Sequence, residues 1–410
     1  MNEKSQTSRF SAAGIITAAA LIPIFTYSLV MALTNTLINE IVNEFNLEGA
    51  SVGLMSSMAS LGFMLSLLFI PMVQGRIKKI TILIAACAVQ AIMLFVSGIS
   101  PTFVFFLFMC VILGASGGFI DAYCNSSVVD ARGEKSPKYL GYLHGLFGVG
   151  SLIAPVVILW LLLQINWRGI YSLLAVVSLL TAVVVFLLTR GRSIQGEINA
   201  TTGEQRLNKA DLKNYIRQKR NMMLLFAAFF SQVILAGVMS WILRYMTVRF
   251  GGTGDIVFLT LTAEDMGILS LTLFWVGATI NRFFFSSIIN KAPLKFFILG
   301  SLISGIAITA GVISDSPTVM FFMVGILGLV CGHFIPVLVS ECAKGYEGKT
   351  TFTTSILMLV MGVSRIITPL LVASISVWIS PAFSMMIPAA AALITVFFGW
   401  MITKTAVNYS

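Results

Sequence analysis

Four side chains with acid–base or ionic chemistry stand inside apolar stretches of the sequence. Asp121 and Asn125 lie one helical turn apart in the run GGFIDAYCN, residues 117–125, and His144 and Arg365 lie in similar surroundings. A carboxylate in lipid costs about 2.5–3.5 kcal/mol if it stays charged, and protonation removes that cost. Asp121 therefore has the properties of a proton carrier. Asn125 could bond either the carboxyl group or a ligand hydroxyl.

His144 and Arg365 could serve the same chemistry. A histidine exchanges protons near neutral pH. His144 lies near the start of its apolar segment, at a depth suited to passing a proton between Asp121 and the cytoplasm; a capping or packing role is the alternative. An arginine near mid-membrane should face a cavity or a carboxylate. Arg365 could neutralise Asp121, or bind an anionic or hydroxyl-rich ligand through two donors.

Other polar and aromatic side chains in the apolar segments are candidates for ligand contact. An aromatic ring can stack on a ligand while its polar edge forms a hydrogen bond, although each ring could equally fill a helix contact. The predicted substrate-binding set is Tyr27, Asn35, Asn125, Trp241, Trp275, His333 and Arg365, with Asp121 and His144 as the proton-coupling pair. The predicted gating charges are Arg76, Lys79, Arg282 and Glu341.

The composition requires a membrane around these residues. Hydrophobic residues make up 58% of the 410, and charged residues only 10%, against roughly 25% in soluble domains. Segments of about 20 apolar residues can cross a bilayer as helices. The predicted spans are 11–38, 50–73, 80–99, 103–129, 139–164, 168–190, 221–248, 266–288, 293–314, 318–342, 350–378 and 381–403. We therefore expect an all-α integral membrane protein with twelve transmembrane helices.

The net charge of +10 is carried mainly by alternate loops between these spans. Such a pattern indicates the cytoplasmic side of a plasma membrane rather than nucleic-acid binding. It places both termini and the long central loop in the cytoplasm. The predicted organisation is an N-terminal six-helix bundle over residues 1–190, a cytoplasmic linker over 191–220 and a C-terminal six-helix bundle over 221–410.

Other classes of chemistry find no support in the sequence. The five cysteines lie within or at the ends of apolar segments, without metal-binding spacing. No activated nucleophile, phosphate-binding loop or nucleotide-binding motif is visible. We therefore expect no metal or cofactor, and neither an enzyme nor an ATP-driven pump. A sensor that binds its ligand without net flux stays open as an alternative.

The two halves share an internal repeat, in which residues 111–158 align without a gap on residues 325–372. The coincident glycines are Gly114 with Gly328, Gly118 with Gly332, and Gly148 with Gly362. Small residues let helices approach closely, so these matches indicate shared packing. The polar residues differ, since Asp121 aligns with Ile335 and Arg365 with Ser151. Repeated halves of this kind place a substrate site between them.

Several short motifs resemble those of the major facilitator superfamily. The segment PMVQGRIKK, residues 71–79, is similar to a degenerate form of that family's basic loop signature and keeps Arg76 and Lys79. Within the superfamily, GGFIDAYCN and YLGYLHGLFGVGSLIAP (residues 139–155) resemble the fucose-permease-like sugar symporters. The segment TNTLINEI keeps Asn35 but has Thr36 where that branch usually has aspartate, and SWILRYM keeps Trp241.

The resemblance implies two pseudo-symmetric six-helix bundles that expose a central site alternately to the two sides of the membrane. It implies a monomer that carries a small polar solute, such as a monosaccharide, together with H⁺. Na⁺ stays open as the coupling ion. The glycine-rich run that ends at Pro155 also resembles a motif of drug/H⁺ antiporters. Export of amphipathic compounds is therefore the alternative function.

Overall fold

The computed structural model describes residues 12–73, 76–132, 136–190, 209–251, 256–258, 260–289, 291–344 and 350–405. Within these ranges, twelve helices are long and apolar enough to cross a membrane. Each overlaps one of the predicted spans, so the predicted fold class is confirmed. The predicted linker contains a short helix, and its residues 191–208 lie outside the described ranges. The division of the chain at residues 190 and 220 stays a prediction.

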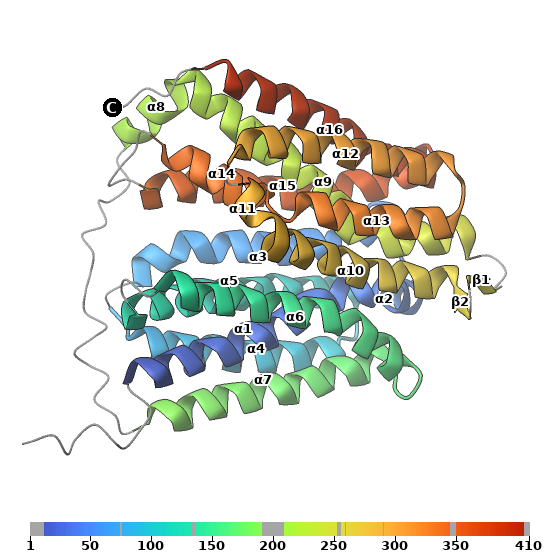
Figure 1. Ribbon diagram of the computed structural model, residues 1–410. Coiled ribbons are helices and arrows are strands. Elements are labelled where there is room, and N and C mark those ends of the chain that lie inside the picture. Colours follow the sequence, from blue (N-terminus) through green and yellow to red (C-terminus); the bar gives the residue numbers. More distant parts are fainter. Residues whose placement is uncertain are drawn as a thin grey trace, which may run out of the picture.

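The first half consists of helices packed side by side (Figure 1). They are α1 (Ala12–Thr36), α2 (Ile38–Phe45), α3 (Ser51–Val73), α4 (Lys79–Gly98), α5 (Phe103–Arg132), α6 (Ser136–Leu162) and α7 (Trp167–Thr189). Helix α5 packs against α1, α3 and α4, while α6 and α7 complete the bundle against α1 and α4. Asn166 starts α7 by accepting a hydrogen bond from the Gly169 amide.

The second half repeats this plan with more interruptions. Its elements are α8 (Lys209–Arg217), α9 (Lys219–Phe250), β1 (Ile256–Phe258), β2 (Leu261–Thr262), α10 (Ala263–Ile280), the π-helix η2 (Asn281–Phe285), α11 (Ser286–Ile289), α12 (Pro293–Ile313), α13 (Pro317–Cys331), α14 (Phe334–Ala343), α15 (Thr350–Trp378) and α16 (Pro381–Thr403). Strands β1 and β2 form a small antiparallel hairpin. Thr262 and Asp265 cap the start of α10 reciprocally.

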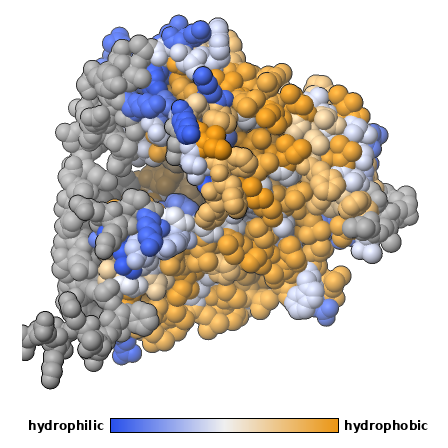
Figure 2. All heavy atoms as spheres, viewed as in Figure 1, coloured by the Kyte–Doolittle hydropathy of each residue, from blue (hydrophilic) through white to orange (hydrophobic). Residues whose placement is uncertain are grey.

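The bundle has two different ends, the linker end and the hairpin end. The linker end carries α8, the start of α9 and the end of α7; the hairpin end carries α2 and the β1–β2 hairpin (Figure 1). Between the ends runs a broad apolar belt (Figure 2). Side chains such as Val104, Trp160 and Ile313 are more than half exposed there, at 76%, 60% and 76%. Such exposure is stable in lipid, where apolar surface needs no cover.

The glycines of the internal repeat lie where two helices approach most closely. A Cβ atom on Gly114 of α5 would lie 1.9 Å from the Ala59 carbonyl oxygen of α3. A Cβ atom on Gly328 of α13 would lie 2.0 Å from the Phe274 carbonyl oxygen of α10. The repeated glycines therefore place equivalent helix pairs at equivalent distances in the two halves, as small residues do in membranes.

Two irregularities in the second half fit each other. The expected continuous span over 318–342 is broken between α13 and α14, and the neighbouring span contains the π-helix η2. Asn281 of η2 donates to the Leu329 carbonyl at 2.7 Å, and Arg282 donates from Nε to the Gly332 carbonyl at 3.0 Å. Because lipid offers no hydrogen bonds, these side chains supply partners that the broken helix lacks.

The halves meet at the hairpin end and part at the linker end. Helix α3 packs against α15, and α6 against α10. Hydrogen bonds that cross the interface include Ser57 Oγ to the Ile366 carbonyl at 2.6 Å, and Thr272 Oγ1 to the Leu152 carbonyl at 3.1 Å. At the linker end, Figure 2 shows a hollow between the halves with hydrophilic residues at its rim. This structure is therefore closed at one end and open at the other.

Candidate functional site

Asp121 is turned into the first bundle by the two glycines that precede it. A Cβ atom on Gly117 would lie 2.2 Å from Cε2 of Tyr27 in α1, and one on Gly118 would lie 1.9 Å from Oγ of Ser66 in α3. Residues three and four positions apart share one helix face. Asp121 therefore lies on the face of α5 that packs against α1 and α3, away from lipid.

The Asp121 carboxyl group has polar neighbours from both halves. Asn125 Nδ2 donates to the Asp121 carbonyl at 2.8 Å and to its Oδ1 at 3.3 Å. Tyr27 of α1 and Arg365 of α15 lie within electrostatic range of the carboxyl group. Among the ion pairs of the described residues, which reach to 4.0 Å, none joins Asp121 to Arg365. The opposite charges are near each other but not in contact.

Arg365 faces the interior of the molecule. Val363, Ile367 and Leu371, each more than 40% exposed, mark the lipid face of α15. Arg365 is two residues from Val363 and from Ile367, about 200° around the helix, and thus on the opposite face. With its amide oxygen turned toward the guanidinium, Gln232 of α9 accepts from Nε at 2.7 Å and from Nη2 at 3.2 Å.

Aromatic rings connect this charged region across the interface between the halves. Phe147 of α6 lies 6.0 Å from Tyr27 and 6.0 Å from Trp275 of α10, measured between ring centroids. The ring of Phe63 on α3 lies 6.0 Å from the Arg365 guanidinium carbon. Such rings offer flat apolar faces to a ligand and a cation–π contact to the arginine.

A small closed cavity lies beside Trp275, with room for about 20 Å³ of solvent. It is lined by Met31, Ala32, Asn35, Ser151, Pro155, Met239, Leu271 and Trp275, from both halves. Asn35 Oδ1 accepts a hydrogen bond from Ser56 Oγ at 2.8 Å, whereas Ser151 Oγ is buried without a partner. This volume is enough for about one water molecule.

His144 is near the open end, eight residues from the start of α6. Val149, Val156 and Trp160 mark the lipid face of α6, and His144 lies on the opposite face, exposed. Its charged neighbour is Arg282, and no hydrogen bond or ion pair in the described ranges links it to Asp121. A direct proton relay between the two would therefore need water or a rearrangement.

Trp241 and His333 lie within the packing of the second half. Trp241 is 3% exposed, with its indole nitrogen unpartnered. His333 is 7% exposed, and its Nδ1 lies 3.2 Å from Asn281 Nδ2 beside the break between α13 and α14. Their predicted substrate role stays a prediction.

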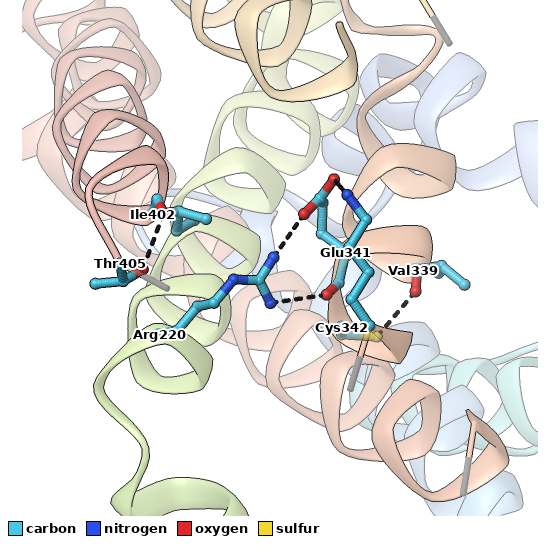
Figure 3. Close-up of polar contacts among 7 residues, drawn as sticks. Arg220, Val339, Glu341, Cys342, Ile402 and Thr405 are labelled. Atoms are coloured by element: carbon cyan, nitrogen blue, oxygen red, sulfur yellow. Dashed lines mark hydrogen bonds and ion pairs between the residues drawn. The ribbon is translucent and has the colours of Figure 1, made fainter. Parts of the chain in front are cut away.

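Three of the predicted gating charges, Lys79, Arg282 and Glu341, have partners within their own half. Lys79 pairs with Asp130 at 2.6 Å, and Arg76 is exposed in the loop before α4. Arg220 of α9 donates to the Glu341 carboxylate at 2.6 Å and to its carbonyl at 3.1 Å, as Figure 3 shows. Lys344 pairs with the other Glu341 oxygen at 2.5 Å. Among the described residues, the ion pairs at the open linker end each stay within one half.

A polar cluster that the sequence analysis missed closes the hairpin end. Asn39 of α2 donates from Nδ2 to Thr247 Oγ1 at 2.6 Å and to Glu264 Oε1 at 2.7 Å, and it accepts from Arg244 at 3.5 Å. Burial raises the pKa of the neighbouring Glu40 carboxyl, and the nearby charge of Glu264 raises it further. The acidic residues after the first span could have signalled this cluster, but the partners of Asn39 are more than 200 residues away in sequence.

Known proteins share this architecture. The chain is 22% identical over 301 residues to the cis,cis-muconate transport protein of Acinetobacter baylyi, covering 72% of this chain and 71% of the relative. A bacterial homologue of the human lysosomal transporter Spinster, solved in an inward-facing, unoccupied conformation, superposes with a TM-score of 0.78 at 16% identity, covering 97% and 98% of the two chains. The E. coli fucose:proton symporter FucP, solved in the outward conformation, gives a TM-score of 0.63 at 17% identity, covering 96% and 100%.

Membership of a family follows from the sequence match and is consistent with the fold. The profile of the Major Facilitator Superfamily matches residues 20–293, about two thirds of the chain. That range contains Asp121, His144, most of the first candidate membrane span and the next seven. The chain belongs to the Major Facilitator Superfamily and is a multi-pass membrane transporter of a small molecule, not an enzyme.

Proposed function

We propose that the protein is a proton-coupled secondary transporter that moves a small polar solute by alternating access. The observation that carries this proposal is the placement of Asp121 and Arg365. They come from different halves, face inward and lie near each other without an ion pair. A carboxyl group that can lose or gain a proton beside a movable cation is suited to coupling.

The open linker end is assigned to the cytoplasm of a plasma membrane. The basic loops lie at that end, as the positive-inside rule requires of cytoplasmic loops. The structure would then be inward-open, with the hairpin end closed toward the outside. The higher TM-score with an inward-facing structure (0.78) than with an outward one (0.63) supports this assignment.

The coupling step follows from charge balance. While Asp121 carries a proton, Arg365 is available to a bound solute. When the hollow opens to the cytoplasm, the solute and proton leave, and the Asp121 carboxylate can then turn to Arg365. Rocking of the two halves would break the hairpin-end contacts and close the linker end, as in other two-bundle carriers.

The solute class first proposed is a monosaccharide or a similarly polar molecule. Tyr27, Phe147 and Trp275 offer stacking faces, while Asn35, Asn125 and Arg365 offer hydrogen bonds. The relatives are named for muconate, fucose and nucleosides. Similarity therefore supports small polar cargo but selects no single compound.

Drug/H⁺ antiport is the second candidate, because the glycine-rich run that ends at Pro155 resembles a motif of drug/H⁺ antiporters. Pro155 and Ser151 line the closed cavity between the halves, so this stretch of α6 is part of the transport pathway in either case. The direction of flux separates the two functions. External acidification of proteoliposomes drives a symported solute inward and an antiported one outward.

The central experiment compares Asp121→Asn with wild type in proteoliposomes. We expect the variant to lose solute accumulation driven by a pH gradient and to keep counterflow exchange, which needs no proton movement. Asp315→Asn, at an exposed ion pair of the hairpin end, serves as the matched control and keeps both activities. If Asp121→Asn still accumulated solute to the wild-type level under a pH gradient, the proposed coupling role would be wrong.

A further inference from the structure

We propose that the transported solute is an organic anion whose carboxylate group binds Arg365, and that it competes for this cation with the Asp121 carboxylate. The proposal rests on the proposed function and narrows it, because it names the chemical group that the site recognises. A neutral monosaccharide would not satisfy it, whereas a sugar acid or an aromatic acid would.

The first reason is the state of the Arg365 guanidinium. An arginine inside a membrane protein normally pairs with a carboxylate or lines a water-filled cavity. In the described part of the chain, Arg365 has no carboxylate within ion-pair distance, and its Nε and Nη2 donate to the neutral amide of Gln232. The Nη1 donors and one Nη2 donor are left for another acceptor.

The second reason is geometric. A guanidinium presents parallel donors that match the two oxygens of a carboxylate, and this bidentate pair is stronger than a bond to a hydroxyl group. The Tyr27 hydroxyl group lies within electrostatic range of Arg365 and can donate to the same anion. Arg365 is partly exposed on the face of α15 opposite to lipid, so packing does not seal it completely.

The surroundings of the cation fit the rest of such a molecule. Phe63 lies over Arg365, and Tyr27, Phe147 and Trp275 continue as a row of rings toward the second half. A planar or ring-shaped body can lie along these faces while its carboxylate remains on the arginine. The preferred ligand is therefore a compact acid with a ring or conjugated body.

Competition for one cation also explains the coupling. Arg365 can balance either the Asp121 carboxylate or the carboxylate of the solute, but not both at once without leaving a net negative charge in a low-dielectric site. Binding of the anion is therefore linked to protonation of Asp121. Each anion would enter with at least one proton.

The first test measures thermal stabilisation of the purified protein by matched probes. The pairs are galacturonate with galactose, gluconate with glucose, and benzoate with benzyl alcohol, each at about 10 mM, which populates sites with a Kd of about 1 mM. We expect at least one carboxylate to raise Tm and its neutral partner to leave it unchanged. A neutral partner that stabilises equally, or a panel in which no carboxylate stabilises, overturns the proposal.

Substitutions then assign the effect to Arg365. Arg365→Gln should abolish the carboxylate-induced shift, and Arg365→Lys, which keeps the charge, should retain part of it. Arg249→Gln, at an exposed pair of the hairpin end, should retain all of it. An Arg365→Gln protein that is monodisperse and still stabilised by the carboxylate contradicts the assignment. If Arg365→Gln does not fold, a folded Arg365→Lys protein decides the assignment. Complete loss of the carboxylate-induced Tm shift in Arg365→Lys supports recognition by the guanidinium geometry rather than by charge alone. A Tm shift as large as in wild type contradicts the assignment to Arg365.

The pH dependence of binding tests the competition itself. In wild type, carboxylate affinity should increase by up to tenfold for each unit of acidification, because one proton is taken up with each anion. In Asp121→Asn the affinity should be independent of pH over the same range. A steep dependence that survives in Asp121→Asn would overturn the competition.

Failure of this proposal is distinguishable from failure of the proposed function. If a neutral sugar accumulates under a pH gradient and Asp121→Asn abolishes that accumulation, the proton-coupled transporter stands and the anion assignment falls. If carboxylates bind in an Arg365-dependent manner but no pH-driven flux occurs, the anion site stands and the coupling role falls.

Discussion

At the scale of single residues, the structure separates charges that stabilise one half from charges that lie between the halves. Glu341 is 1% exposed and shares its carboxylate between Arg220 and Lys344 in the second half (Figure 3). Asp121 and Arg365 come from different halves and lie within electrostatic range of each other without an ion pair. The first arrangement maintains a fold in any state, whereas the second can change between states.

Removal of the Glu341 carboxylate should destabilise the protein. Glu341→Ala leaves the Arg220 guanidinium, which is 7% exposed, without its counter-charge, and we expect a loss of about 3–5 kcal/mol in unfolding free energy. Lys344→Ala removes a partner that is 46% exposed, and should cost about 0–1 kcal/mol. Thermal unfolding in detergent measures both. Equal losses of unfolding free energy in the two variants would show that the buried Glu341–Arg220 pair stabilises the protein no more than the exposed Glu341–Lys344 pair.

Glu40 should make closure of the hairpin end depend on pH. Its pKa is raised by burial in the closed end, so closure binds its proton more tightly than an open state in which water reaches it. The protonated Glu40 carboxyl group stabilises closure fully at pH values below the ordinary carboxyl pKa. This stabilisation is lost as pH rises through the raised pKa of Glu40. Glu264, which raises this pKa further, is the charged group beside it, and Arg244 in turn lies near Glu264.

Spin labels at Glu48→Cys and Thr260→Cys, both exposed at the hairpin end, can measure this effect. Between about pH 8 and about pH 5, acidification should shift the distance distribution toward the closed form. Glu40→Gln should make the distribution less dependent on pH and closer to the closed form throughout. An unchanged pH response in Glu40→Gln would assign the effect to another group.

At the scale of elements, glycines decide how closely helices pack. Gly114 and Gly328 occupy equivalent positions in the repeat, and each lies against a backbone carbonyl of a neighbouring helix. The sequence predicted this role because both halves keep the residue. It did not predict the π-helix η2 or the break after α13, since these depend on hydrogen bonds between two spans.

Gly114→Ala should therefore weaken the contact between α3 and α5. The added Cβ would lie 1.9 Å from the Ala59 carbonyl oxygen, so the helices must separate, at a cost of about 1–3 kcal/mol. Gly141→Ala is the matched control, because a Cβ there meets nothing within 4 Å and alanine favours a helix. Thermal unfolding should show a lower Tm for the first variant only. A similar Tm for both would refute the close contact.

At the scale of the whole molecule, the hollow reaches from the linker end only part of the way through the protein. His144 and Ser151 lie seven residues apart on the inward face of α6. His144 is exposed, while Ser151 is 1% exposed and lines the closed cavity. The boundary between the open and closed parts of the pathway therefore lies between these two turns.

Cysteine labelling tests that boundary. The five native cysteines are buried, which keeps the background low. His144→Cys should react with a polar maleimide much faster than Ser151→Cys, by tenfold or more if the closed end opens in about one molecule in ten or fewer. Equal rates in the two variants would mean that the hollow extends past Ser151 in the dominant state.

The sequence by itself determined the membrane-spanning helices, their alternate basic loops, the internal repeat and the inward-facing candidates Asp121 and Arg365. These follow from local composition and spacing, because lipid imposes the same length and polarity on every span. Only the tertiary structure decided which polar groups meet: Asn39 with Glu264, Glu341 with Arg220, and Arg365 near Asp121. Those contacts join residues distant in sequence, and they depend on how two bundles pack and which end is closed. No local pattern specifies either.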